Sequence, residues 1–190
     1  MTRKHMTIAT LVAVLLMATV SAWAKDDTPD EKRADIRKDV AAVMKRLYKA
    51  EPHAKSAVAG AAGYAAFDNM GMNLLVVSTA RGSGMAVDNK TKKETFMKMI
   101  SGGVGLGAGI KDYCVIFLFE NQQALARFID SGWDASTQAD AAAKSDTKGG
   151  AYSGASSVAP GVWVYQLTKK GLALQVTLQG TKYFKNGDLN

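Results

Sequence analysis

Glycine occupies every second position from Gly103 to Gly109, and apolar residues fill the positions between. Successive side chains of a strand point to opposite faces, so this spacing predicts a strand over 101–110 with one bare face and one apolar face. The spacing recurs at Gly82 and Gly84. Bare faces let a sheet bend sharply or let another element approach closely, so a structural role is expected, with an acyl-chain groove as the alternative. The structural glycines are Gly82, Gly84, Gly103, Gly105, Gly107 and Gly109.

Phosphate-binding loops are a poor explanation of the same glycines. A dinucleotide-binding loop lies between a strand and a helix, but here the strand-like run 113–119 follows. A P-loop needs glycine before its lysine and Ser or Thr after it, whereas Lys111 lies between Ile110 and Asp112. The sequence therefore gives no positive indication of a nucleotide site.

The first residues have the pattern of a secretory signal peptide. Arg3 and Lys4 precede the apolar run 6–20, and Ala22 and Ala24 form an A-x-A cleavage site. Cleavage near Ala24 predicts a periplasmic or secreted protein with three parts: signal peptide 1–24, tail and amphipathic helix 25–51, and a single domain 52–190. The formal charge of +7 falls to +5 when the two leader cations are removed (7 − 2 = 5). Acidic lipids and polymers are plausible partners, and export makes nucleic acid an unexpected one.

A helix is predicted directly after the tail. Thr28, Pro29 and Glu31 have the spacing of a capping box with proline at the first helical position. Apolar residues follow at helical spacing, and Pro52 is expected to end the element. Basic residues cover much of the remaining surface, which indicates either a solvated face or a lipid contact. The apolar positions are Ile36, Val40, Val43, Met44 and Leu47.

The rest of the chain alternates strand-like runs with turns. A turn is predicted at 69–73, strands at 74–87 and 113–119, a polar turn at 88–93, and a strand or connector at 95–100. Asn121 is a plausible N-cap for a helix ending near Gly132. An alanine-rich helix over 134–144, an irregular segment over 145–157 and a hairpin of 162–168 with 172–179 complete the pattern, with a last strand at 181–184. We expect an α+β domain with a curved, mainly antiparallel, glycine-rich sheet or half-barrel packed with a few helices.

Residues for catalysis or metal binding form no recognisable motif. Nucleophilic catalysis usually needs a histidine base, and His53, the one histidine after the leader, is expected to have a surface or capping role. Cys114 lies within an apolar run and is interpreted as a small core residue. One histidine and one cysteine do not supply a usual zinc ligand set. We therefore expect neither an enzyme nor a bound metal or cofactor.

Three motifs occur in order along the chain: ARGSGMAV, GVGLGAGIKDYCVIF and KKGLALQVTLQG. With their flanking strands, over roughly 52–184, they resemble the SYLF domain, a lipid-binding module found in eukaryotic proteins and in bacterial secreted proteins. The resemblance implies a compact α+β module. It also implies binding of phosphoinositides and other acidic lipids, as in the eukaryotic members.

The expected function is therefore non-enzymatic binding of acidic phospholipids or other envelope lipids, with possible peripheral membrane association. Lysines at loops and strand ends can reach lipid headgroups, although each could equally be a solvated surface residue. Two alternatives are binding of another envelope protein or peptidoglycan through a sheet edge, and an unrecognised hydrolase. The candidate contact lysines are Lys92, Lys93, Lys98, Lys169, Lys170, Lys182 and Lys185.

Overall fold

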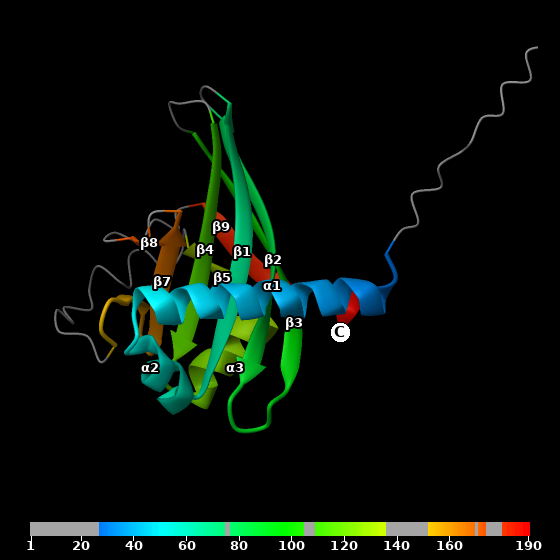
Figure 1. Cartoon of the computed structure of the whole chain (residues 1–190). Helices are drawn as coiled ribbons and strands as arrows, with labels where there is room; N and C mark the ends of the chain where they lie inside the picture. Colours follow the sequence, from blue (N-terminus) through cyan, green and yellow to red (C-terminus); the bar gives the residue numbers. More distant parts are fainter. Residues whose placement is uncertain (1–26, 75–76, 105–108, 136–151, 170, 174–179) are drawn as a thin grey trace, which may run out of the picture.

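The fold is known from a computed structural model, which describes residues 27–74, 77–104, 109–135, 152–169, 171–173 and 180–190 (Figure 1). Within these ranges, nine antiparallel strands form one sheet in the order β5-β9-β3-β2-β1-β4-β7-β6, and β8 pairs with β7. The strands are β1 (Gly63–Leu74), β2 (Val77–Asp88), β3 (Glu94–Val104), β4 (Gly109–Phe119), β5 (Trp133–Asp134), β6 (Ser156–Ala159), β7 (Val162–Thr168), β8 (Gly171–Leu172) and β9 (Thr181–Lys185). The predicted α+β fold with a curved antiparallel sheet is confirmed.

Strands β1, β2 and β3 follow one another as neighbours in the sheet. The predicted polar turn joins β2 to β3, and the Asp88 carboxylate accepts hydrogen bonds from the backbone N–H groups of Lys90 (2.8 Å) and Thr91 (2.9 Å). The turn predicted at 69–73 is wrong, because these residues continue β1. Their backbone pairs with β2 on one side and β4 on the other, which outweighs the turn preference of their asparagines and glycine.

The single strand predicted over 101–110 is also wrong. Ser101 and Val104 belong to the end of β3, beside β2, whereas Gly109 begins β4 on the far side of β1. Gly105 and Gly107 lie outside the described residues. The alternate glycines therefore predicted strand structure correctly at Gly103 and Gly109. These two glycines belong to different strands, β3 and β4, which lie on opposite sides of β1 and β2.

Helix α1 (Pro29–Ala50) crosses one face of the sheet, which we call the outer face (Figure 1). Its predicted capping box is present: Thr28 Oγ1 accepts from the N–H of Glu31, and the Glu31 carboxylate accepts from the N–H of Thr28. All five predicted apolar positions are buried against the sheet. The helix ends before Pro52, as predicted, and is followed by the unpredicted short helix α2 (Ala54–Gly60).

Helix α3 (Gln122–Ser131) covers the opposite, inner face, together with β5. The Asn121 side chain caps it by accepting from the N–H of Ala124 at 2.9 Å, and Gly132, with φ 72°, ends it as predicted. Aromatic rings fill this side of the sheet. Their members are Phe67, Phe117, Phe119, Phe128, Trp133 and Tyr183.

The predicted C-terminal hairpin is present where it is described, as β7 with β8, and the last strand is β9. The irregular segment predicted over 145–157 is wrong at its end, because Ser156 and Ser157 pair with β7 in strand β6. The alanine-rich helix predicted over 134–144 lies almost entirely outside the described residues. Its first residue, Asp134, lies in the short strand β5 and pairs there with Lys182 of β9.

Candidate functional site

The predicted contact lysines fall into three places on the sheet. Lys92 and Lys93 lie at the turn between β2 and β3. Lys169 follows β7, and Lys170 lies outside the described residues. A third group lies on the neighbouring strands β3 and β9, where Lys98 and Lys182 share one face and Lys185 lies on the opposite face, paired with Asp130 of α3.

The third group lies beside two exposed apolar side chains that sequence analysis did not select. Ile100 is 46% exposed and Phe184 is 37% exposed. Cross-strand pairing aligns Arg81, Ile100 and Lys182 in one row, and Ser83, Lys98 and Phe184 in the next. Residues two apart on a strand share a face, so both rows lie on one surface. We call this surface the outer patch; its residues are Arg81, Ser83, Lys98, Ile100, Lys182 and Phe184.

Helix α1 determines where the outer patch begins. Phe96, the next residue of β3 on the same face, is buried, and the Arg37 guanidinium lies over its ring at 5.1 Å from the centroid. Arg37 also pairs with Glu94, with 2.7 Å between Nε and Oε2. Beyond Phe96 the helix no longer covers the strand. Figure 1 shows the upper ends of β1, β2 and β4 extending well past the helix.

The cations of the outer patch differ in their pairing. Lys98 Nζ lies 2.9 Å from the Asp188 carboxylate, and this bond lowers the pKa of Asp188. Lys182 Nζ lies 3.0 Å from Asp134. Arg81 is exposed and has no ion-pair partner among the described residues. Exposed ion pairs are weak and screened by salt, so the paired lysines can exchange their partners for another anion.

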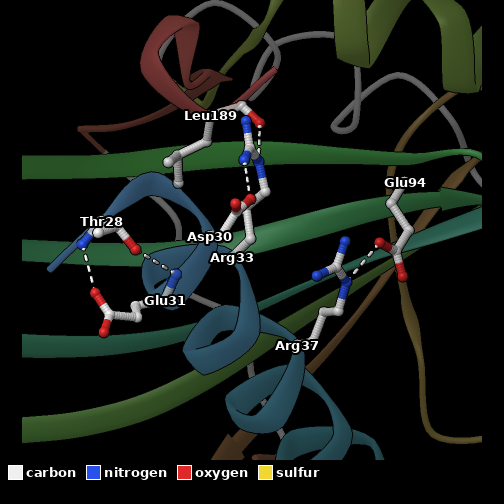
Figure 2. A network of polar contacts seen from close by, with 7 residues as sticks. All are labelled: Thr28, Asp30, Glu31, Arg33, Arg37, Glu94 and Leu189. Atoms are coloured by element: carbon white, nitrogen blue, oxygen red, sulfur yellow. Dashed lines mark hydrogen bonds and ion pairs between the residues drawn. The ribbon is translucent and has the colours of Figure 1, made fainter.

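The C-terminal residues hold α1 against β3 (Figure 2). Arg33 joins α1 to the C-terminal residues, since its Nε donates to the Leu189 carbonyl at 2.9 Å. Its Nη1 pairs with Asp30 of the same helix at 2.6 Å. Leu189 is buried in the core under α1. The Asn190 amide accepts from the N–H of Phe96 and donates to its carbonyl, which extends the pairing of β3 beyond β9. This arrangement fixes the border of the outer patch.

Cys114 lies under α1 and has the core role that the sequence predicted. Arg46 Nη1 donates to its sulfur at 3.0 Å, and the thiol donates to the Asp68 carboxylate at 3.3 Å. Burial, followed by the negative charge of Asp68, raises the pKa of the thiol to about 12. The thiolate form is therefore scarce at neutral pH, and the residue is unsuited to nucleophilic attack.

Other residues with catalytic or metal-binding chemistry are dispersed. His53 occupies the N-cap position of α2 with a highly exposed side chain, and its Nδ1 lies 3.0 Å from a Glu51 carboxylate oxygen. No group of three His, Cys, Asp or Glu side chains that could hold a metal occurs in the described ranges. None of the described helices is both long and apolar enough to cross a membrane.

Comparison with known proteins relates the chain to one family. Residues 100–190 match the family model described as "Ysc84: Las17-binding protein actin regulator". The protein "Beta cell expansion factor A" of Aeromonas veronii is 34% identical over 164 residues. That alignment covers 85% of this chain, which spans 60% of the length of the relative. With its three ordered motifs and its curved antiparallel sheet, the chain belongs to the SYLF-domain family, to which the matched Ysc84 model corresponds.

Proposed function

We propose that the protein binds anionic lipid surfaces through the outer patch. The observation that carries this proposal is the exposure of Ile100 and Phe184 on the same strand surface as Arg81, Lys98 and Lys182. Apolar side chains surrounded by cations suit a lipid interface, where the apolar groups enter the acyl boundary and the cations contact headgroups. The proposed role is binding, without a chemical reaction.

The unpaired Arg81 is expected to contribute most of the electrostatic attraction. A cation near an anionic membrane contributes about 1 kcal/mol. Lys98 and Lys182 contribute less, because each must leave its aspartate partner. The turn at Lys92 and Lys93 lies several residues back along β3, about 20 Å from Ile100 at the rise of a strand. The lysines of this turn can therefore serve as a control, because they carry the same kind of charge at a distance from the outer patch.

Co-sedimentation with vesicles of phosphatidylglycerol and phosphatidylcholine tests the proposal. The triple variant Arg81→Gln, Lys98→Gln, Lys182→Gln should lower vesicle affinity about tenfold at low salt, and the difference should shrink as salt rises. The control variant Lys90→Gln, Lys92→Gln, Lys93→Gln removes the same charge at the β2–β3 turn and should bind nearly as wild type does. Equal losses in both variants would contradict the outer patch and indicate unspecific charge attraction.

The apolar part of the outer patch has its own test. Ile100→Asn with Phe184→Asn should reduce binding to the same vesicles at high salt, where the electrostatic contribution is screened. Circular dichroism serves as the control for folding. Wild-type protein that fails to bind anionic vesicles at any salt concentration would instead favour a protein or peptidoglycan partner in the envelope.

We also propose that residues 1–24 are removed on export, which would place the outer patch in the periplasm or outside the cell. The basic start, short apolar run and A-x-A site support this proposal. The intact mass of the exported protein checks it. A mass that includes 1–24 would contradict the localisation.

A further inference from the structure

The outer patch adjoins an exposed carboxylate on the next strand of the sheet. Asp68 of β1 pairs across the strands with Ser83 of β2, which belongs to the outer patch. Asp68 is exposed, and its carboxylate accepts a hydrogen bond from the thiol of Cys114, a residue of the core on the α1 side of the sheet. Directly opposed residues share a face, so Asp68 extends the surface of the outer patch and adds a negative charge to it.

This carboxylate lies close to the unpaired cation of the outer patch. Arg81 is two positions from Ser83 on β2, so it is a diagonal neighbour of Asp68 on the same face. Diagonal neighbours are about 7–8 Å apart, which is within reach of a long side chain. Arg81 and Asp68 nevertheless form no ion pair with each other, and neither has another ion-pair partner among the residues that the structure describes.

The cation of α1 in this region has other partners. Arg46 donates from Nη1 to the Cys114 sulfur at 3.0 Å and from Nη2 to the Thr168 carbonyl at 3.3 Å. It makes no ion pair with Asp68 in the described part of the chain. The Asp68 carboxylate and the Arg81 guanidinium therefore present opposite charges to the solvent, side by side on one surface.

Two opposite charges at this spacing suit a ligand that carries both charges itself. A guanidinium binds phosphate oxygens through paired N–H groups, and a carboxylate accepts hydrogen bonds from a primary ammonium. A phosphoethanolamine headgroup carries both groups, joined by a short two-carbon link. The exposed Ser83 hydroxyl, next to Asp68 and on the same strand as Arg81, can donate to the phosphate. A choline headgroup has the same charges but no N–H donor for the carboxylate.

The apolar residues of the outer patch indicate that such a headgroup belongs to a membrane lipid. Ile100 pairs with Arg81 across β3 and β2, and its side chain is exposed beside the guanidinium. Phe184 is exposed in the neighbouring row. Apolar side chains gain free energy when they enter the acyl boundary of a membrane, and phosphoethanolamine free in solution offers them no such contact.

We propose that Arg81, Ser83 and Asp68 bind the headgroup of an ethanolamine phospholipid. The Arg81 guanidinium and the Ser83 hydroxyl donate to the phosphate, and the Asp68 carboxylate accepts from the ammonium. Ile100 enters the acyl boundary beside them. This inference rests on the proposed membrane binding by the outer patch and adds a headgroup selectivity to it.

Vesicles of equal charge test the selectivity. One set contains phosphatidylglycerol with phosphatidylethanolamine, and the other contains the same fraction of phosphatidylglycerol with phosphatidylcholine. Co-sedimentation of the wild-type protein should show about fivefold higher affinity for the ethanolamine set, as expected for one exposed charged contact. Equal affinity for both sets would overturn the selectivity and leave the proposed membrane binding intact. Failure to bind either set would overturn both.

Asp68→Asn separates the carboxylate from the effect of ethanolamine lipids on bilayer packing. Asparagine keeps an oxygen that can accept from the Cys114 thiol, so the fold should be retained, and circular dichroism checks this. The variant should lose the preference for ethanolamine. It should bind the choline set at least as tightly as the wild type, because a negative charge near an anionic surface is removed. A preference that persists in this variant would overturn the assignment of Asp68.

Asp130→Asn supplies a matched control on the other face of the sheet. It removes the same charge from α3, where the carboxylate pairs with Lys185 at 3.5 Å. This variant should keep the wild-type preference for ethanolamine, and a loss there would count against a site on the outer surface. Soluble phosphoethanolamine, added at the concentration of the vesicle lipid, should not displace the protein. Displacement would show that the headgroup alone is the ligand and would overturn the assignment to a membrane lipid.

Discussion

At the scale of single residues, Gly84 shows where the alternate-glycine pattern has a structural cause. A Cβ atom at this position would overlap the carbonyl oxygen of Ala66 and the ring of Phe67, both of which are completely buried. Neither neighbour can move without disturbing β1 or the aromatic core. Gly102, in contrast, has nothing within 4 Å of the place where its Cβ would lie.

Gly84→Ala should therefore lower the free energy of unfolding by about 1 to 3 kcal/mol through overpacking. Gly102→Ala is the matched control, and its effect should stay within about 0.5 kcal/mol. Urea denaturation followed by circular dichroism measures both. Similar changes in unfolding free energy in the two variants would mean that close packing is not the reason for a glycine at position 84.

At the scale of elements, α1 contributes its apolar stripe to the same core as the sheet. Leu47 is completely buried and packs with residues from several strands. The division into a preceding helix, 25–51, and a domain, 52–190, remains a prediction from sequence. The buried stripe and the contacts of Arg33 and Arg37 give the helix both apolar and polar connections to the domain.

Leu47→Ala tests whether α1 unfolds together with the sheet. If it does, the variant should lose about 2 to 5 kcal/mol of stability, as buried leucines commonly do. The exposed Lys45→Ala serves as the control and should change little. Denaturation followed by the fluorescence of Trp163, which lies in the core under α1, monitors the sheet. A sheet transition unaffected by Leu47→Ala would show that the helix is energetically separate.

Helix limits could be predicted from the sequence more reliably than strand pairing. Local signals such as the Thr28 capping box, the Asn121 cap and Gly132 predicted helix limits because their effects depend on neighbouring residues. Strand pairing depends on distant residues, so the assignment of 101–110 to one strand failed. The apolar part of the outer patch was missed for the same reason: Ile100 resembles a core strand residue, and its exposure follows from where α1 stops covering β3.

At the scale of the whole molecule, one thiol and two tyrosine hydroxyls are buried in the core and have raised pKa values. Burial is the largest cause of a raised pKa at Cys114 and Tyr165, each to about 12, and at Tyr183. Negative charge from Asp68 and Glu51 adds to the shift at the first two residues, respectively. In the unfolded chain these groups release their protons near pH 9 for cysteine and pH 10 for tyrosine.

Stability should therefore fall as pH rises. Between about pH 9 and 12 the unfolded chain binds fewer protons than the folded protein, so the free energy of unfolding decreases with pH. Below pH 9 these groups are protonated in both states and contribute no slope. Urea midpoints at pH 8, 9, 10 and 11 measure the effect, and Tyr165→Phe should reduce it. A constant midpoint over this range would contradict the proposed burial of these protons.

The strand order also has a consequence for synthesis. β1, β2 and β3 can pair as soon as they leave the ribosome, because each follows its partner directly. β9 pairs with β3 only after the long segment between Val104 and Thr181 has been made, and Ser101 then pairs with Thr181, 80 positions further along the chain (181 − 101 = 80). Until then β3 keeps an open edge, and the aromatic interior lacks Tyr183. A nascent chain that stalls before Thr181 would present both features to other chains, so its last strand protects it from aggregation.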